Sequence, residues 1–207
     1  MSTPNRVIGI CGSLRRGSYT RKILEIALEG AARNGADTEL VDLRDYQLVF
    51  YGQTESETDY PPDVFRLRET VKAAHGLILG TPEYHGSLSG VLKNALDLMG
   101  FDEFEGKMIG LVGVSGGRLG AINALNSLRN IGRNLHAWVL PQQVSLPEAY
   151  KHFDKNGRLT DDDYRSRLLD IGELIARFAM LHQMQKSDEF IRMWEGLPVN
   201  PGGKKPS

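Results

Sequence analysis

Residues 7–20 read VIGICGSLRRGSYT, which passes from an apolar run through a turn into the start of a helical pattern. The turn is rich in glycine and hydroxyl side chains and contains two adjacent arginines. When a strand ends in such a turn and a helix follows, free backbone N–H groups and the positive end of the helix dipole converge on one point. The hydroxyls of Ser13, Ser18 and Thr20 and one guanidinium can complete the hydrogen bonding around an anion. The stretch therefore predicts a site for a phosphate monoester.

The charges of the chain are balanced. Its 207 residues include 25 basic and 26 acidic side chains, interleaved, with a formal net charge of −1. This balance argues against nucleic acid or an anionic membrane as the main partner. No apolar run approaches the ~18 residues of a membrane-spanning helix, and a single cysteine, Cys11, suits a reducing compartment. We expect a cytoplasmic protein without a metal site, with one domain over residues 1–190 and a loosely ordered tail over 191–207.

Apolar strands and amphipathic helices alternate along the chain. The expected strands are 6–11, 38–43, 77–79, 108–114 and 138–140 (with Val144), and the expected helices are 20–34, 62–74, 89–99, 119–131 and 164–183. Apolar strands without alternation, separated by helices, indicate a parallel sheet covered on both faces. Right-handed crossovers then give a doubly wound, three-layer α/β sandwich. Ligands bind such sheets beyond the carboxyl ends of the strands, where the loops 12–20, 81–89 and 115–120 follow.

The first of these loops differs from other phosphate-binding turns. It lacks the lysine of a P-loop, and its glycines do not have the spacing of a dinucleotide-binding turn. A cysteine-dependent phosphatase loop has an arginine six places after the cysteine, whereas Gly17 stands six places after Cys11. We interpret Cys11 as a small buried hydrophobe at a strand end and keep a Cys11 phosphatase as the lesser alternative.

The second loop indicates the class of ligand. Residues 81–97 read TPEYHGSLSGVLKNALD, which resembles the signature of the NADPH-dependent FMN reductases, where P-E-Y-N-x-S precedes a helix beginning G-x-L-K-N-A. The first loop, G-S-L-R-x-x-S, and the small residues at 115–120 resemble the same family, over roughly residues 6–161. The resemblance implies a flavodoxin-like fold with a five-stranded parallel sheet of order 2-1-3-4-5. It also implies non-covalently bound FMN and reduction by NADPH or NADH.

The residues and the resemblance together assign a cofactor site. The expected FMN-binding residues are Ser13, Arg15, Ser18, Tyr19, Thr20, Pro82, Glu83, Tyr84, His85, Gly86, Ser115, Gly116, Gly117 and Arg118. Pro82 and Tyr84 suit the wall of a flat isoalloxazine ring, and adjacent glycines let the backbone approach its other edge. We expect no catalytic side chain because FMN carries the chemistry. Glu83 is expected to bond to backbone or to a neighbouring subunit.

His85 stands where the family usually has asparagine. Two hypotheses remain open for it. In the first, His85 stabilises a turn and takes no part in the chemistry. In the second, it belongs to the cofactor site and titrates near neutral pH.

The resemblance implies an NAD(P)H-dependent oxidoreductase. Hydride passes to FMN, and electrons then pass to a quinone, free flavin, chromate or azo acceptor in ping-pong order. The alternative is a flavodoxin-type electron carrier without its own NAD(P)H site, although such carriers are usually more acidic. Apolar residues beside the site (Tyr84, Leu88, Phe101) and the family predict a homodimer or homotetramer, in which the neighbouring subunit helps to wall the flavin.

Overall fold

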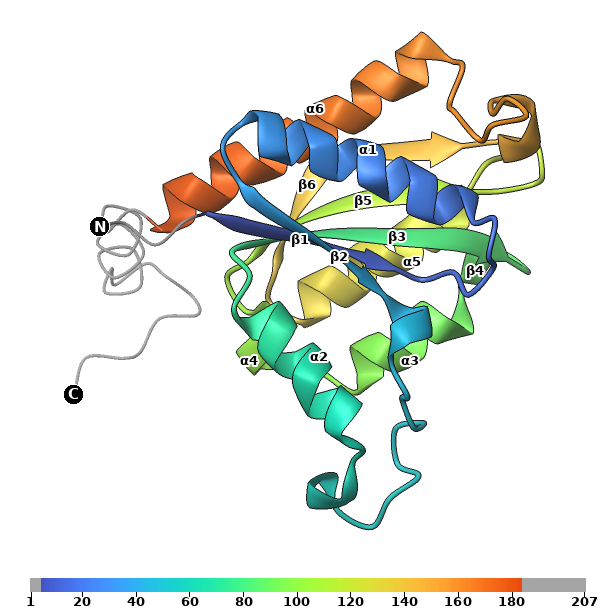
Figure 1. Ribbon diagram of the computed structural model, residues 1–207. Helices are drawn as coiled ribbons and strands as arrows, with labels where there is room; N and C mark the ends of the chain where they lie inside the picture. The colour runs from blue at the N-terminus through green and yellow to red at the C-terminus, as the bar shows by residue number, and fades with distance from the viewer. Residues whose placement is uncertain (1–4, 184–207) are drawn as a thin grey trace, which may run out of the picture.

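The structure, a computed structural model, describes residues 5–183 and is built around a parallel sheet (Figure 1). Its main path runs β2-β1-β3-β5-β6. The bounds are Arg6–Cys11 (β1), Asp37–Asp42 (β2), Gly76–Tyr84 (β3), Met108–Val114 (β5) and Trp138–Leu146 (β6). A short strand, Ser87–Leu88 (β4), pairs antiparallel with the end of β3. Counted without β4, this is the predicted order 2-1-3-4-5.

Helices cover both faces of the sheet. Figure 1 shows α1 and α6 together on one side of it, and α2, α3, α4 and α5 on the other. Their bounds are Tyr19–Arg33 (α1), Pro62–Lys72 (α2), Gly90–Asp97 (α3), Phe101–Phe104 (α4), Ile122–Asn134 (α5) and Asp162–Gln183 (α6). Short 3₁₀ turns lie at Leu43–Asp45, Glu57–Asp59 and Ala149–Lys151. The predicted three-layer α/β class is confirmed.

Each face of the sheet has its own apolar core, because successive side chains of a strand point to opposite faces. Val7 and Cys11 of β1 belong to the core under α1 and α6, whereas Ile8 and Ile10 belong to the core on the opposite face. The helices α1 and α6 touch closely because Gly172 has no side chain. A Cβ atom there would lie 1.8 Å from the carbonyl oxygen of Ala27.

Several elements differ from the sequence-based expectation. The strand expected at 77–79 extends to Tyr84, because Thr81 and Pro82 continue to pair with β5. The helix expected at 119–131 begins only at Ile122. The last strand continues through Pro141 as an edge strand with a register shift against β5, and an edge position tolerates proline. The predicted tail 191–207 lies outside the described residues. Within residues 5–183, no helix is long and apolar enough to cross a membrane.

Candidate active site

The carboxyl ends of β1, β3 and β5 open into a cleft of about 540 Å³. All three predicted loops contribute to its wall, as expected for a doubly wound sheet. A fourth segment, after β6, joins them. The lining residues are Ser13, Arg15, Arg16, Gly17, Ser18, Tyr19, Thr20, Pro82, Glu83, Tyr84, Val114, Ser115, Gly116, Ala149 and Tyr150.

The first loop presents hydroxyl groups to this cleft at the start of α1. Ser18 caps the helix, and its Oγ accepts a hydrogen bond from the backbone N–H of Arg21 at 3.2 Å. The side chains of Ser13 and Thr20 are 3% and 1% exposed. Neither hydroxyl has a hydrogen-bond partner among residues 5–183. The two residues line the cleft, and their hydroxyl oxygens remain in contact with its open space. Together with the helix N-terminus they form a donor set suited to an anion.

Two arginine side chains of the same loop also have no partner within the described residues. Arg15 and Arg16 are exposed, line the cleft and have no ion pair or hydrogen bond within the described part of the chain. The one carboxylate in the lining, that of Glu83, has other partners. The mouth of the cleft beside the first loop therefore carries uncompensated positive charge, which favours a phosphate.

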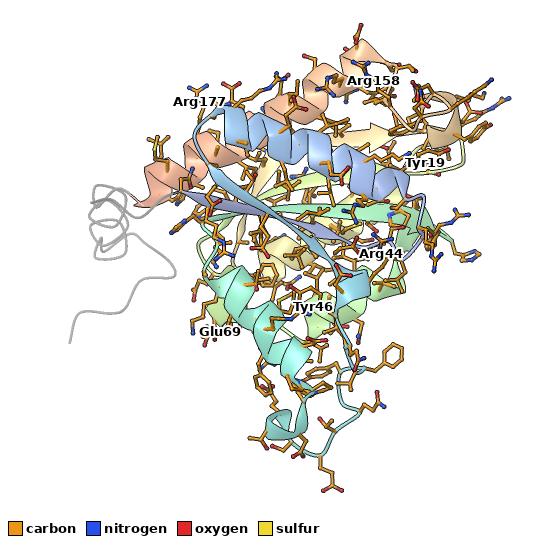
Figure 2. The ribbon with its side chains drawn as sticks, in the orientation of Figure 1. Tyr19, Arg44, Tyr46, Glu69, Arg158 and Arg177 are labelled. Carbon is orange, nitrogen blue, oxygen red and sulfur yellow. The ribbon has the colours of Figure 1, made fainter. Side chains whose placement is uncertain are left out.

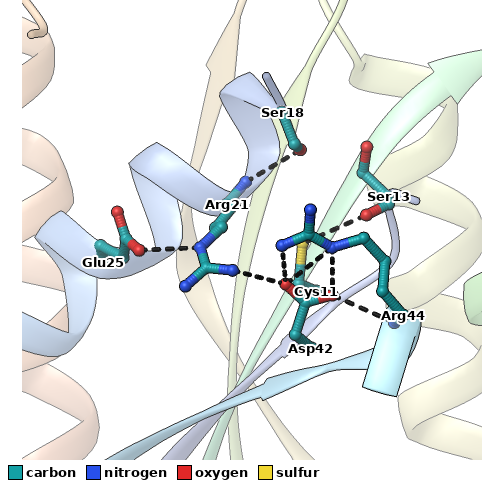
Figure 3. A network of polar contacts seen from close by, with 7 residues as sticks. All are labelled: Cys11, Ser13, Ser18, Arg21, Glu25, Asp42 and Arg44. Carbon is teal, nitrogen blue, oxygen red and sulfur yellow. Dashed lines mark hydrogen bonds and ion pairs between the residues drawn. The ribbon is translucent and has the colours of Figure 1, made fainter. Parts of the chain in front are cut away.

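A buried ion network supports the loop from behind (Figure 3). Asp42, at the end of β2, is 4% exposed and pairs with Arg21 at 2.7 Å and with Arg44 at 2.6 Å. Burial alone would raise the pKa of Asp42, but hydrogen bonds from Arg44 and the positive charges of both arginines lower it below its usual value. Asp42 thus ties β2 to the first turn of α1. Sequence reasoning missed this network, because Arg21 and Asp42 belong to different elements and are distant in the chain.

Cys11 is not a nucleophile in this structure. Its side chain is fully buried, and its thiol lies 3.8 Å from the carbonyl oxygen of Ser13. Burial raises the pKa of the Cys11 thiol, whereas a nucleophilic cysteine must be an accessible thiolate. The geometry argues against the Cys11 phosphatase, and the prediction of a small buried hydrophobe is confirmed.

The second loop is a tight hairpin between β3 and β4. Tyr84 pairs with Ser87 across it, and the two residues between them, His85 and Gly86, have φ angles of 51° and 79°. A two-residue type I′ turn requires positive φ at both positions, and histidine and asparagine tolerate such a φ better than most residues. His85 is exposed and lies outside the cleft lining. The geometry favours the turn hypothesis for His85.

Glu83 binds the start of α5. Its carboxylate accepts hydrogen bonds from the backbone N–H of Ala124 at 3.0 Å and from the side-chain amide of Asn123 at 3.4 Å. A carboxylate at a helix N-terminus is favoured by the helix dipole. The expected bond to backbone is therefore present, and it attaches the wall of the cleft to the next helix.

The third loop is joined to the segment after β6. The Ser115 carbonyl accepts from the Ala149 N–H at 3.0 Å, and the Gly117 carbonyl accepts from the Glu148 N–H at 3.1 Å. A Cβ atom at Gly116 would meet no atom of the protein within 4 Å. Packing of the chain thus does not require glycine at 116, and the open space beside it belongs to the cleft.

Comparisons with known proteins identify the family. The model of the family described as NADPH-dependent FMN reductase matches residues 5–151. An NAD(P)H-dependent FMN reductase of Pseudomonas aeruginosa is 38% identical over 170 residues, which cover 80% of this chain and 90% of the relative. An FMN-dependent NADPH-azoreductase of Staphylococcus aureus is 36% identical over 163 residues, covering 76% and 86%. The chain belongs to the NADPH-dependent FMN reductase family. Membership confirms the resemblance, and with it an oxidoreductase with FMN as cofactor and NADPH or NADH as donor.

Solved structures agree on the fold of this FMN reductase. The flavoenzyme NAD(P)H:(acceptor) oxidoreductase FerB of Paracoccus denitrificans is 26% identical with a TM-score of 0.66, covering 86% of this chain and 98% of that one. An NADH:FMN oxidoreductase in its apo form (EMOB) is 22% identical with a TM-score of 0.68, covering 83% and 88%. An archaeal flavodoxin is 14% identical with a TM-score of 0.60, covering 84% and 99%. The last two show the fold alone, which is flavodoxin-like.

The cleft of the reductase suits FMN. Unpaired hydroxyls and Arg15 match a phosphate, and the open space beside Gly116 matches a flat ring. Four residues expected to bind FMN, namely His85, Gly86, Gly117 and Arg118, lie outside the cleft lining, and their role stays a prediction.

Sequence reasoning missed two residues of the cleft lining, Ala149 and Tyr150. They could have been found from topology, because the loop after the last parallel strand also begins at the carboxyl edge of the sheet. No group of three metal-ligating side chains occurs within residues 5–183.

Proposed function

We propose that this cleft holds FMN with its phosphate in the loop 12–20 and its ring between two walls. One wall is formed by Pro82 and Tyr84, and the other by Ser115 and Gly116. The observation that carries the proposal is that the hydroxyls of Ser13 and Thr20 have no partner within residues 5–183 and line the same cleft as the open space at Gly116. A phosphate monoester attached to a flat heterocycle uses both features at once.

Each group has a defined task in this arrangement. Ser13, Ser18 and Thr20 donate hydrogen bonds to the phosphate, and Arg15 adds a charge-assisted bond. Tyr84, which is 43% exposed, positions the donor over the ring. When bound, FMN supplies two-electron redox chemistry between NAD(P)H and an acceptor. The protein supplies position and electrostatics, so no side-chain acid or base is needed.

We propose that the acceptors are small oxidants such as quinones, free flavin, chromate and azo compounds. The names of the relatives support this range, since one is an FMN reductase and another an azoreductase. The cleft is open at its mouth, so donor and acceptor can occupy the same face in turn. Such alternation gives ping-pong kinetics.

Steady-state kinetics without any partner reductase test this function. The purified protein should oxidise NADPH when a quinone is present, and double-reciprocal plots at several quinone concentrations should be parallel. Intersecting lines would mean that donor and acceptor bind together, which contradicts the shared face. FMN binding without NADPH oxidation would instead identify a flavodoxin-type electron carrier.

We propose that the reductase is a cytoplasmic homodimer or homotetramer. Exposed apolar side chains at the third loop and the start of α5 support an assembly, namely Leu119 and Ile122. Phe101, which was expected beside the site, contacts the ring of His136 at the amino end of the sheet instead. Leu119 is 80% exposed and Ile122, three residues further along the chain, is 49% exposed. Neighbouring exposed apolar residues indicate a surface that a partner covers. Light scattering should give at least twice the chain mass, and Leu119→Glu should lower it. A monomeric parent protein would contradict the assembly.

A further inference from the structure

Tyr150 is an exposed aromatic residue at the mouth of the cleft, and the FMN-binding residues predicted from sequence do not include it. Its side chain is 56% exposed and lines the same cleft as Tyr84. Lys151 lies beside it, with its Nζ 5.9 Å from the ring centroid. The ring is thus not part of the apolar core. A large aromatic surface left open beside a ligand cleft is available to a ligand.

The backbone that carries this ring is held in place. Glu148 and Ala149, just before Tyr150, donate hydrogen bonds to the carbonyl oxygens of Gly117 and Ser115. Glu148 has a φ of 40°, in the left-handed region that non-glycine residues rarely adopt. Such outliers persist only where the surroundings enforce them, and they cluster at functional sites.

A second anchor lies three residues further along the chain. Phe153 stacks on Tyr19 at the start of α1, with ring centroids 4.7 Å apart, and Figure 2 labels Tyr19 at that end of the helix. The segment around Tyr150 is therefore attached to the third loop on one side and to the first helix on the other. An exposed ring on a fixed backbone loses little entropy when a ligand stacks on it.

We propose that Tyr150 is a stacking platform that makes the reductase prefer flat aromatic acceptors, such as quinones and azo compounds, over inorganic oxidants. The proposal rests on the function proposed above, because it assigns a specificity-determining residue to the same cleft. A quinone or azo-arene presents a π face to the tyrosine ring, and offset stacking of such rings adds to their burial. Chromate has no π face and gains nothing from the ring.

Binding and kinetics of three variants test the platform. Tyr150→Ala removes the ring, Tyr150→Leu keeps apolar bulk, and Tyr150→Phe removes only the hydroxyl, which lies 3.4 Å from the Glu148 carboxylate. Binding of menadione, a naphthoquinone, is measured by calorimetry on the oxidised, FMN-loaded protein without a donor. The ratio of kcat/KM for menadione to kcat/KM for chromate is measured separately. Tyr51→Ala, at an exposed tyrosine outside the cleft, is the matched control.

The expected losses follow from the energy of an aromatic pair. Menadione affinity and the kinetic ratio should both fall about three- to tenfold in Tyr150→Ala. They should fall by a smaller factor in Tyr150→Leu and stay near the parent values in Tyr150→Phe and Tyr51→Ala.

Three results would overturn the platform. The first is an unchanged ratio in Tyr150→Ala. The second is an equal loss in Tyr150→Phe, which would assign the effect to the hydroxyl and Glu148. The third is loss of FMN in both Tyr150→Ala and Tyr150→Leu, which would make Tyr150 a cofactor-binding residue. A parent protein that binds no FMN, or that fails to oxidise NADPH with any acceptor, would contradict the proposed function instead.

Discussion

The two ends of the parallel sheet differ in what their polar side chains bind. At the amino end, the Lys107 ammonium donates to the carbonyl oxygens of Val71 and Lys72 in the last turn of α2, at 2.5 and 2.8 Å. At the carboxyl end, the side chains of Ser13 and Thr20 line the cleft and have no hydrogen-bond partner within residues 5–183. A polar group that is hydrogen-bonded within the protein is committed to the fold. One that faces a cleft without a partner is available to a ligand.

The largest effect on ligand binding should come from Arg15→Ala. Because the guanidinium is free to bond to the phosphate, its loss should weaken FMN binding by about 1.5–3 kcal/mol, the range for a hydrogen bond to a charged group. Riboflavin, which lacks the phosphate, should bind with little change. Calorimetric titration of both flavins measures this, with Arg133→Ala, an exposed arginine on α5, as control. Equal losses for FMN and riboflavin would show that Arg15 does not bind the phosphate.

At the opposite end of the sheet, Lys107→Met should change stability and leave FMN affinity alone. Burial lowers the pKa of Lys107 from 10.5 to about 8. Between these values the unfolded chain holds more protons than the folded protein, so Lys107 makes the free energy of unfolding increase with pH. After allowance for the partial exposure of the side chain, this increase in the free energy of unfolding is on the order of 2 kcal/mol.

Denaturant unfolding at pH 7.5 and pH 10 measures this contribution. The parent protein should gain more stability over that interval than Lys107→Met does. The same pH dependence in both proteins would contradict a lowered pKa for Lys107. A change of FMN affinity in Lys107→Met would contradict the separation between the amino end of the sheet, which serves the fold, and the carboxyl end, which binds the ligand.

Tyr84→Ala should separate donor positioning from cofactor retention. Nicotinamide must lie close over the flavin ring, and small displacements slow hydride transfer. The variant should keep FMN but lose about tenfold in kcat/KM for NADPH, which corresponds to roughly 1.4 kcal/mol of positioning energy. Stopped-flow mixing of the FMN-loaded variant with NADPH measures the step. An unchanged rate would mean that the hairpin does not border the hydride-transfer site.

The smallest effect should come from His85→Asn. Asparagine tolerates the left-handed conformation that the turn imposes, so stability should change by less than about 0.5 kcal/mol and the pH profile of kcat/KM should keep its shape. His85→Gly, which relieves any strain of a positive φ, is the matched control. An inflection of that profile that disappears in both His85→Asn and His85→Gly would place His85 in the chemistry.

The elements that sequence predicted well are those whose signal is local. Arg6–Cys11 and Met108–Val114 have the predicted bounds because each is an unbroken apolar run that ends in a polar turn. The end of β3 was missed because Thr81 and Pro82 resemble a turn, whereas pairing with β5 keeps them extended. Glu83 and Tyr84 then pair with β4. The extended conformation at the end of β3 thus depends on β5, a strand that is distant in the sequence.

The residues of the cleft divide in the same way, into those with a local sequence signal and those placed by contacts between distant segments. Ser13, Ser18 and Thr20 occur in one contiguous loop, so composition and spacing were enough to predict them. Asp42 and Tyr150 depend on approaches between distant segments. Asp42, at the end of β2, pairs with Arg21 in the first turn of α1. Tyr150 reaches the cleft because the segment before it is bonded to the third loop. Neither approach leaves a pattern in the residues around it.

Anaerobic titration with NADPH of the purified protein, loaded with one equivalent of FMN, tests the central claim most directly. If the cleft binds FMN and admits the donor to it, the visible absorption of the oxidised flavin should bleach in proportion to the NADPH added. Bleaching should be complete at roughly one equivalent, without any partner protein. A protein that leaves FMN in the filtrate, or that retains FMN whose absorption NADPH does not bleach, would contradict the account.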